Sequence, residues 1–397
     1  MNKPIQAIID FSASKIFTHH WKSIETFYNL ISKQPSEIQV FIPKYAKESL
    51  LQNLLNIRRT LISTDFGPTF HEMPLLKIAN EIIKRYLYKF PRKLKDKIRI
   101  ILLALYTRKI RKQIIALCLR HEKVVVLFPS VEPISVFTFL KLRSKKIPNL
   151  EWRLRLIGSQ ERGLLSGGDE TELLRDSIQA NPKGVRIGYE TFPYLRYLQS
   201  KGYANNIMYW SPFPSEVLQQ AKGSRDFLRI GFLGSAKERK GFELIPSITE
   251  AISMEYSKLE FIVQEAAYPW RDYAKAHESL SNNPQVTLLP GELSDAELTN
   301  YIASCDLIVL PYDPESYALA ASAILYHAAD LHIPVICPKG VGFAEEVEKF
   351  NIGLVYQDFS VFSEFSATMK RIHKIQESDF VRYNQERDNK NRTFLSV

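Results

Sequence analysis

Short apolar runs alternate with helix-like segments along the whole chain of 397 residues. The runs are rich in Val, Ile and Leu, which is typical of strands buried in a sheet. They lie at residues 5–9, 38–42, 123–128, 152–157, 185–189, 228–233, 259–263, 286–289, 307–310, 335–337 and 354–356. Segments with helical patterns separate many of them, for example at 21–31, 48–62, 192–200 and 242–254. This alternation predicts an α/β protein built on parallel sheets.

The region from 306 to 346 holds the clearest strand–helix–strand unit. A buried run closed by Pro311 predicts the first strand, an Ala- and Leu-rich segment at 318–330 predicts the helix, and 333–337 predicts the second strand. Strands joined in this way run parallel, with a right-handed crossover. The small side chains at 318–323 leave the first amides of the helix accessible. Amides at the positive end of a helix suit a phosphate or diphosphate.

The composition, with 45% apolar and 24% charged residues, is that of a globular protein long enough for two domains. Cys118, Cys305 and Cys337 are far apart, lie in apolar runs and have no metal-binding spacing, which predicts buried thiols in a reducing cytoplasm. No signal-peptide pattern precedes Asp10, and no apolar run approaches the ~18 residues of a membrane-spanning helix. We therefore expect a cytoplasmic protein.

Charge is distributed unevenly between the two halves of the chain. Residues 1–200 hold 34 Lys and Arg against 17 Asp and Glu, whereas residues 201–397 hold 19 against 26. The excess is concentrated at 84–112, where twelve Lys or Arg stand against one acid and aromatic residues lie among them. Such a segment can be a solvated helical face, a nucleic-acid surface or a surface that docks on an anionic membrane. We expect membrane docking, because the aromatic and aliphatic residues suit a bilayer interface and no nucleic-acid motif accompanies the charge.

The order of elements from 306 to 346 resembles the nucleotide-sugar site of family 4 (group 1) glycosyltransferases. The resemblance extends from about 227 to 356 and is weaker elsewhere. It implies the GT-B fold, in which two Rossmann-like, doubly wound domains face each other across a cleft. Residues 1–214 would then form the acceptor-side domain and residues 215–378 the nucleotide-sugar domain. Residues 379–397 would form a last helix that can cross back to the first domain.

The resemblance places the donor diphosphate at a loop that follows the strand at 228–233. Lys240 and Gly241 match the Lys-Gly of the family loop. The family Arg is replaced by Ser235, so Lys237 or Arg239 would supply the second charge. Fixed cations stabilise the negative charge that develops on the leaving nucleoside diphosphate. A basic surface turn is the alternative interpretation.

The family Glu-x7-Glu pair is absent, because Leu319 and His327 occupy its two positions. Glu315 is the nearby carboxylate that can substitute, and Ser322 belongs to the small-residue helix start. His327 is either an interior histidine or, as the resemblance implies, a contact to the ribose of the donor.

The glycine loop that follows the strand at 335–337 resembles the family motif that binds the donor sugar. Gly342 belongs to this loop, and Glu345 and Glu346 fit its carboxylate position. These acids can instead be favoured by the dipole at the start of a helix. Gly291 lies in a turn that resembles the base-binding turn of the family.

The first domain supplies the candidate acid/base residues. Glu161 follows the predicted strand at 152–157, after which relatives often place a His, and Glu132 follows the predicted strand at 123–128. No Asp-x-Asp motif is present, so we expect no metal-held diphosphate and no cofactor. The nucleotide-sugar would be a substrate.

The sequence thus predicts a metal-independent, hexosyltransferase-like glycosyltransferase of bacterial-type glycan assembly. Its partners would be a nucleotide-sugar donor, a lipid-linked or polysaccharide acceptor and the anionic inner face of the cell membrane, and not nucleic acid. The absence of the Glu pair and of the His leaves a second hypothesis, a catalytically weak GT-B module that binds partners in a glycan assembly complex. A nucleotide-sugar epimerase is the third, although the several catalytic carboxylates and histidines usual for epimerases are not seen.

Overall fold

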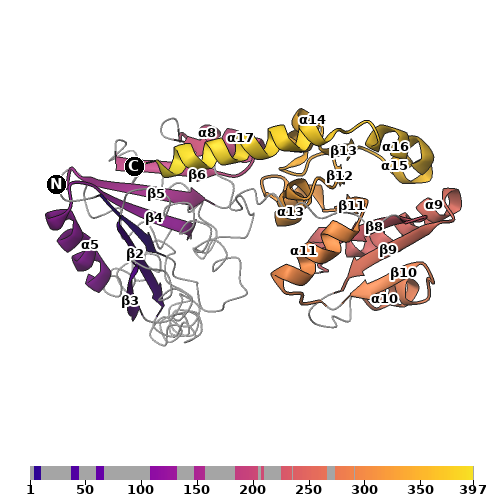
Figure 1. Ribbon diagram of the computed structural model, residues 1–397, viewed down its shortest axis with the longest axis horizontal. Helices are drawn as coiled ribbons and strands as arrows, with labels where there is room; N and C mark the ends of the chain where they lie inside the picture. Colours follow the sequence, from indigo (N-terminus) through magenta and orange to yellow (C-terminus); the bar gives the residue numbers. More distant parts are fainter. Residues whose placement is uncertain are drawn as a thin grey trace, which may run out of the picture.

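The computed structural model describes residues 4–9, 37–43, 60–66, 108–131, 147–156, 184–203, 207–209, 225–234, 236–265, 273–289 and 291–396. These residues form two parallel sheets, each with its own hydrophobic core. Figure 1 shows the sheets side by side, with the amino-terminal sheet in indigo and magenta. We call the residues of the amino-terminal sheet and its helices the first domain, and those of the other sheet the second domain. The predicted boundary between 214 and 215 lies outside the described residues.

The first domain has a seven-stranded sheet in the order β3-β2-β1-β4-β5-β6-β7. All of its neighbouring strands pair in parallel. The strands are β1 (Ile5–Ile9), β2 (Glu37–Pro43), β3 (Thr60–Phe66), β4 (Val124–Val131), β5 (Leu150–Leu156), β6 (Val185–Tyr189) and β7 (Ile207–Tyr209). Its described helices are α5 (Arg108–Arg120) and α8 (Phe192–Ser200).

The second domain has a six-stranded parallel sheet in the order β10-β9-β8-β11-β12-β13. The strands are β8 (Leu228–Phe232), β9 (Leu259–Gln264), β10 (Val286–Leu289), β11 (Leu307–Val309), β12 (Val335–Pro338) and β13 (Gly353–Tyr356). Its helices are η3 (Glu238–Lys240), η4 (Phe242–Leu244), α9 (Ile245–Glu255), α10 (Ala274–Ser281), α11 (Asp295–Ser304), α12 (Pro314–Tyr317), α13 (Ala323–Asp330), α14 (Ala344–Phe350), α15 (Ser360–Ser363), α16 (Phe365–Ile372) and α17 (Glu377–Leu395).

Helices cover both faces of this sheet, as a doubly wound sheet requires. One core cluster joins the sheet to α9, α10, α15 and α16, and the other joins it to α11, α13, α14 and α17. Alternate residues of β11 take part in the two clusters: Leu307 and Val309 pack on the first set of helices and Ile308 on the second. A strand buried on both faces is apolar along its whole length, which is why the sequence pattern identified it.

Two predicted helices were wrong in their extent. The segment 48–62 was predicted as helix, but β3 begins at Thr60 and pairs in parallel with β2. The segment 318–330 was predicted as one helix, but residues 318–322 separate α12 from α13. Side-chain caps override the helix propensity of alanine here. Asp313 caps α12 by accepting a 2.8 Å hydrogen bond from the Ser316 amide, and Ser322 caps α13 by accepting a 3.3 Å hydrogen bond from the Leu325 amide.

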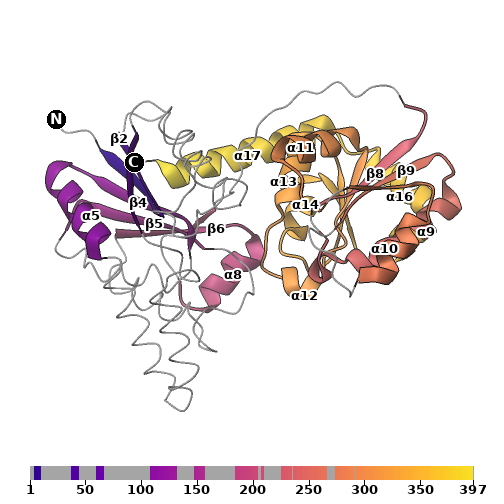
Figure 2. The ribbon, with the colours of Figure 1, turned by 90° about the horizontal axis from the view of Figure 1, so that it is seen from below.

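The last helix, α17, connects the two domains (Figures 1 and 2). On the second domain, Arg387 donates a 3.0 Å hydrogen bond to the buried carboxylate of Asp330 and packs between the rings of Tyr326 and Tyr383. At its carboxyl end, the chain reaches β5, where the Arg153 guanidinium donates a 2.6 Å hydrogen bond to the carbonyl of Ser396. The second predicted boundary, between 378 and 379, falls within the first turn of α17. No described helix is both long enough and apolar enough to cross a membrane.

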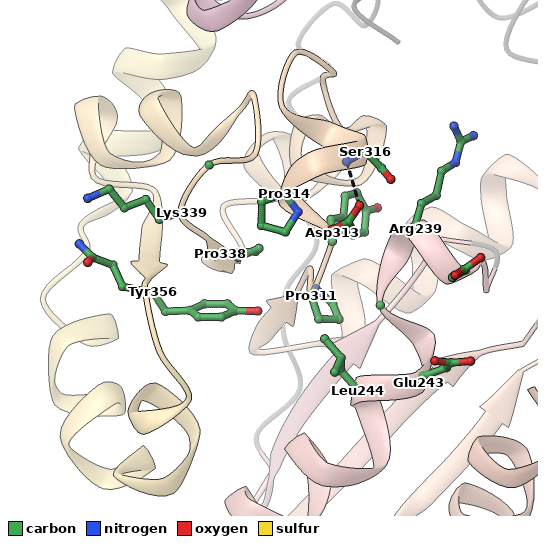
Figure 3. Close-up of a pocket in the computed structure, with 15 residues that line it drawn as sticks. Arg239, Glu243, Leu244, Pro311, Asp313, Pro314, Ser316, Pro338, Lys339 and Tyr356 are labelled. Atoms are coloured by element: carbon green, nitrogen blue, oxygen red, sulfur yellow. Dashed lines mark hydrogen bonds between the residues drawn. The ribbon is translucent and has the colours of Figure 1, made fainter. Parts of the chain in front are cut away.

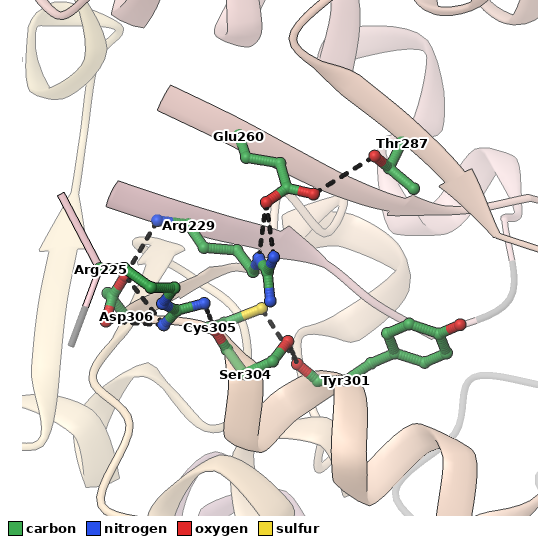
Figure 4. A network of polar contacts seen from close by, with 8 residues as sticks. All are labelled: Arg225, Arg229, Glu260, Thr287, Tyr301, Ser304, Cys305 and Asp306. Carbon is green, nitrogen blue, oxygen red and sulfur yellow. Dashed lines mark hydrogen bonds and ion pairs between the residues drawn. The ribbon is translucent and has the colours of Figure 1, made fainter. Parts of the chain in front are cut away.

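The start of the second sheet is held by a network of ion pairs (Figure 4). Arg225 pairs with Asp306, and the same carboxylate accepts a 2.9 Å hydrogen bond from the backbone amide of Arg229. The Arg229 guanidinium pairs with Glu260 of the neighbouring strand at 2.7 Å. These contacts lie at the amino ends of β8, β9 and β11, so they position the strands from the edge opposite the candidate site.

Candidate functional site

The candidate site lies at the carboxyl ends of β8 and β11. From β8 the chain proceeds to β9 through α9 on one face of the sheet, whereas from β11 it proceeds to β12 through α13 on the other face. The strand order therefore reverses between β8 and β11. In open α/β sheets, ligands bind at this point, outside the carboxyl ends of the strands.

The loop that follows β8 is held close to β11 by two glycines. Gly241 has a φ of 68°, and a Cβ on it would lie 1.9 Å from the carbonyl oxygen of Pro311. Gly234 has a φ of 97°, and a Cβ there would lie 2.9 Å from the Nζ of Lys240. Only glycine adopts these conformations without strain and leaves this space free. The loop thus places the Lys240 ammonium directly above the Gly234 backbone.

Lys240 brings a cation into a largely apolar environment. Its Nζ lies 5.6 Å from the centre of the Tyr312 ring and next to the side chain of Ile324, in the first turn of α13. Lys240 is partly exposed at the surface of the site. Burial lowers the pKa of its amine, Tyr317 opposes this shift and Arg239 adds to it. Among the described residues, no carboxylate pairs with the ammonium. A partly buried cation that no described carboxylate neutralises, near the positive end of a helix, is an environment that an anion stabilises.

The Tyr312 ring near Lys240 is itself held in place by other side chains. Its ring lies 4.5 Å from that of Tyr317 and 5.8 Å from that of Phe343, between ring centres. Its hydroxyl is hydrogen-bonded to Ser322, and burial raises its pKa to about 12. The predicted donor residue Ser322 is itself buried and also caps α13. Its side chain therefore holds the helix start in place.

Gln264 joins Gly291, in the predicted base-binding turn, to the loop at 234–241, which we call the phosphate loop because the sequence predicts diphosphate binding there. The Gln264 side chain accepts a 2.7 Å hydrogen bond from the Gly234 amide and donates a 3.0 Å hydrogen bond to the Gly291 carbonyl. Gln264 was not among the predicted site residues. The available signal is a polar residue that directly follows the apolar run at 261–263 and is buried in the structure.

A pocket of about 930 Å³ opens beside the phosphate loop, at the carboxyl ends of β8, β11, β12 and β13 (Figure 3). Arg239 and Lys339 line it from opposite sides, and Asp313 lies between them. The hydroxyl of Tyr356 points toward Pro311 at its centre. The volume is within the range of pockets that hold small-molecule ligands. Its mixed lining of charged, hydroxyl and proline groups suits a polar ligand such as a sugar.

Gly342, Glu345 and Glu346 were predicted together as a donor-binding motif, but in the structure each has a different partner. Gly342 donates a 2.7 Å hydrogen bond to the Tyr317 carbonyl, and a Cβ on it would lie 2.7 Å from the Ala320 carbonyl oxygen. Glu345 pairs with Arg196 of α8 in the first domain. Glu346 is buried and accepts a 2.8 Å hydrogen bond from the Tyr383 hydroxyl of α17. Only Glu345 is placed near solvent, and it already serves as a contact between the domains.

The two positions of the family Glu pair have different surroundings. His327 is partly buried and lies one turn after the exposed Ala323, on the less buried side of α13. Leu319 packs against the core of the first domain, and its carbonyl accepts a 2.8 Å hydrogen bond from the Thr191 hydroxyl. The site thus replaces one family carboxylate with an interdomain contact. Glu315 is exposed on α12.

For the remaining predicted residues, the structure gives few or no contacts. Lys237 is exposed, just before η3. Ser235, Glu132 and Glu161 lie outside the described residues, so their assignment to donor binding and catalysis stays a prediction. Within the described part of the chain, no group of three or more His, Cys, Asp or Glu is arranged to hold a metal ion. Metal-independent chemistry stays a prediction as well.

No family model and no curated protein matches the sequence. Solved structures match over nearly the whole chain. Sucrose-phosphate synthase from Thermosynechococcus elongatus is 12% identical, with a TM-score of 0.62 over 99% of this chain and 96% of that one. HepE from Anabaena in complex with UDP-glucose is 12% identical, with a TM-score of 0.59 over 98% of both chains. WaaG, a glycosyltransferase involved in lipopolysaccharide biosynthesis, is 13% identical, with a TM-score of 0.50 over 98% of this chain and 95% of that one.

These likenesses confirm the predicted fold class. The chain has the GT-B fold, with two parallel-sheet α/β domains. The finer resemblance to family 4 glycosyltransferases stays a prediction from the sequence, because the identities are low.

Proposed function

We propose that this protein is a glycosyltransferase that uses a nucleotide-sugar donor, most simply a UDP-sugar. The observation that carries the proposal is the Lys240 ammonium, which is partly buried beside the Tyr312 ring, lacks a described carboxylate partner and lies at the point where the strand order reverses. A bound diphosphate would supply the missing negative charge. HepE, which shares the fold, binds UDP, glucose and UDP-glucose in its complexes, and this supports a uridine donor.

In the proposed reaction, the acceptor hydroxyl forms a bond to the anomeric carbon of the sugar and gives its proton to a base, for which Glu132 and Glu161 are the candidates, as the bond between that carbon and the diphosphate oxygen breaks. Charge develops on the leaving UDP, and Lys240 together with the start of α13 stabilises it. The Gly234 backbone and the Tyr312 ring hold the ammonium in position, so it needs little reorganisation during the reaction. These fixed charges can replace a metal ion, and we therefore propose metal-independent transfer of a hexose.

We also propose a lipid-linked or polysaccharide acceptor at the cytoplasmic face of the membrane. The basic segment 84–112 overlaps the start of α5. The outward side of α5 exposes Ile115 and, at 84%, Leu119, with the exposed cations Lys112 and Arg120 on the same helix. Exposed aliphatic residues among cations suit the interface of an anionic bilayer, where each Lys or Arg contributes about 1 kcal/mol.

The donor proposal is tested by incubating the purified protein with UDP-, GDP- and ADP-sugars and measuring release of the nucleoside diphosphate. Release that depends on an added glycan or lipid-linked acceptor is expected. Free epimerised sugar would instead indicate the epimerase, and binding without turnover would indicate the partner-binding module. Activity that remains in excess EDTA is expected if no metal ion is needed.

The membrane proposal is tested by cosedimentation with neutral and anionic liposomes. Wild-type protein should bind only the anionic liposomes and should dissociate as the salt concentration rises. Leu119→Glu should weaken binding. Met254→Glu, which adds the same charge at a 78% exposed apolar position of the second domain, should not. Equal binding to both kinds of liposome, or none to either, would favour a soluble acceptor.

A further inference from the structure

The side chain of Gln264 forms the described hydrogen-bonded link between two loops at the carboxyl edge of the second sheet. Its Oε1 accepts from the amide of Gly234, in the loop that carries Lys240, and its Nε2 donates to the carbonyl of Gly291. The partners determine the orientation of the carboxamide, because one is a donor and the other an acceptor. Gln264 is also buried, so water does not compete strongly for these two bonds.

The two linked loops have separate tasks in the proposed function. Gly234 lies beneath the ammonium that would hold the diphosphate, and Gly291 lies in the turn predicted to hold the base. In a nucleoside diphosphate, one ribose separates these two groups, so their span varies little. A ligand that joins two groups gains affinity over the separate groups only when the two subsites are held at the matching distance.

We propose that Gln264 is a positioning residue that sets the distance between the base subsite and the diphosphate subsite. This inference rests on the proposed function and adds to it the group that makes the site selective for a whole nucleoside diphosphate. Both hydrogen bonds of the Gln264 side chain are made to backbone atoms. Gln264 acts through the backbone of Gly234 on one side and of Gly291 on the other.

The test compares three probes by calorimetry or ligand-observed NMR: UDP, uridine and inorganic pyrophosphate. Gln264→Met keeps the length of the side chain and removes both hydrogen bonds. Its affinity for UDP should fall about tenfold or more, while its affinities for uridine and pyrophosphate should change less than about twofold. The separate probes can each occupy one subsite whatever the distance between the two.

Gln285, at the amino ends of the strands of the same sheet, provides a matched control. Gln285 uses its side chain in the same way, accepting a 2.7 Å hydrogen bond from Ser253 and donating a 3.2 Å hydrogen bond to the Ser257 carbonyl. It precedes β10, whereas Gln264 ends β9. Gln285→Met should therefore leave the affinity for all three probes unchanged.

A second variant separates positioning from general damage. In Gln264→Glu, the ionised carboxylate can accept from Gly234 but cannot donate to Gly291. Protonation restores a donor, so the affinity for UDP, relative to wild type at the same pH, should recover as the pH falls from about 8 to about 5. Loss of packing alone would not produce this pH-dependent rescue.

The outcomes are distinguishable. Unchanged UDP affinity in Gln264→Met, or equal losses for UDP, uridine and pyrophosphate, would overturn the positioning role while wild-type binding upheld the proposed donor site. Wild-type protein that binds none of UDP, GDP and ADP would overturn the proposed function and this inference with it.

Discussion

The ammonium of Lys240 lies 5.6 Å from the centre of the Tyr312 ring, although the two residues belong to loops that follow different strands. The ring is held by Tyr317 and by the hydroxyl contact to Ser322, which in turn caps α13. The cation, the aromatic ring and the helix start thus form one supported unit. An attraction between a cation and a ring compensates for only part of the lost hydration, which leaves the unit suited to an anionic ligand.

Replacing Lys240 should therefore lower the activity without lowering the stability of the fold. Lys240→Met should lower kcat/KM about 10²- to 10³-fold, as expected for the loss of one group that stabilises developing charge. The free energy of unfolding should stay the same or rise slightly, because a partly buried charge is replaced by an apolar side chain of similar length. Steady-state kinetics and urea unfolding measure the two effects. Lys237→Met, on the exposed neighbour, is the control, and full activity of Lys240→Met would show that the diphosphate binds elsewhere.

The affinity for UDP should fall at alkaline pH, because the Lys240 amine loses its proton there. Burial lowers the pKa of this amine below its ordinary value of 10.5, so the amine loses its proton at a lower pH than it would in the unfolded chain. Between the folded and unfolded pKa values the unfolded chain binds more protons, and this group therefore adds stability as the pH rises. Binding of UDP needs the charged form and should weaken over the same rise. Titrations from pH 7 to pH 10 should show this loss in wild type and not in Lys240→Met; the same loss in both would assign it to another group.

Variants of Glu345 and Arg196 distinguish two roles of Glu345: an ion pair between the domains, or a contact to the donor sugar. The pair is exposed and joins the two domains, so its loss should change the free energy of unfolding by less than about 1 kcal/mol. If Glu345 acts only between the domains, Glu345→Gln and Arg196→Gln should change the KM for the donor equally. If it binds the donor sugar, as the family resemblance implies, only Glu345→Gln should raise the KM. We expect equal effects, because the carboxylate is already engaged by Arg196.

His327 should contact the nucleoside and not the transferred sugar. The family resemblance aligns it with a Glu that reaches the ribose, and it lies on the less buried side of α13. His327→Ala should then weaken UDP and UDP-glucose by the same factor, about two- to tenfold for one neutral hydrogen bond. Competition binding with the two ligands measures the ratio. A loss confined to UDP-glucose would assign His327 to the sugar subsite.

The Asp330–Arg387 pair should contribute strongly to the attachment of α17. Arg387→Met leaves the buried carboxylate of Asp330 without its cation and should cost about 3–5 kcal/mol of unfolding free energy. The double variant Asp330→Leu with Arg387→Met should recover part of this loss, because no charge is left buried. Arg382→Met, on the exposed side of the same helix, should cost less than about 1 kcal/mol. A double variant as unstable as Arg387→Met would mean that packing, and not charge, dominates.

Most strands of both domains were predicted from the sequence, whereas β3 and β7 were not. Strands such as β11 and β12 are buried by helices, so their residues are apolar in an unbroken run that can be recognised without tertiary information. The loop of Lys240 and Gly241 was identified through the family resemblance, which places a Lys-Gly pair there. The structure supplies the reason for the glycine, which has a left-handed φ and approaches Pro311 closely.

The partners of the site residues were decided only by the tertiary structure. Glu345 and Glu346 are neighbours in sequence, but one reaches Arg196 in the first domain and the other is buried against Tyr383 of α17. Gln264 appears in the sequence as the polar end of a strand, and its role depends on two loops 30 and 27 residues away. Periodicity and propensity describe which residues are buried and which are helical. They do not describe contacts between residues distant in the chain, because such contacts depend on how whole elements pack against each other.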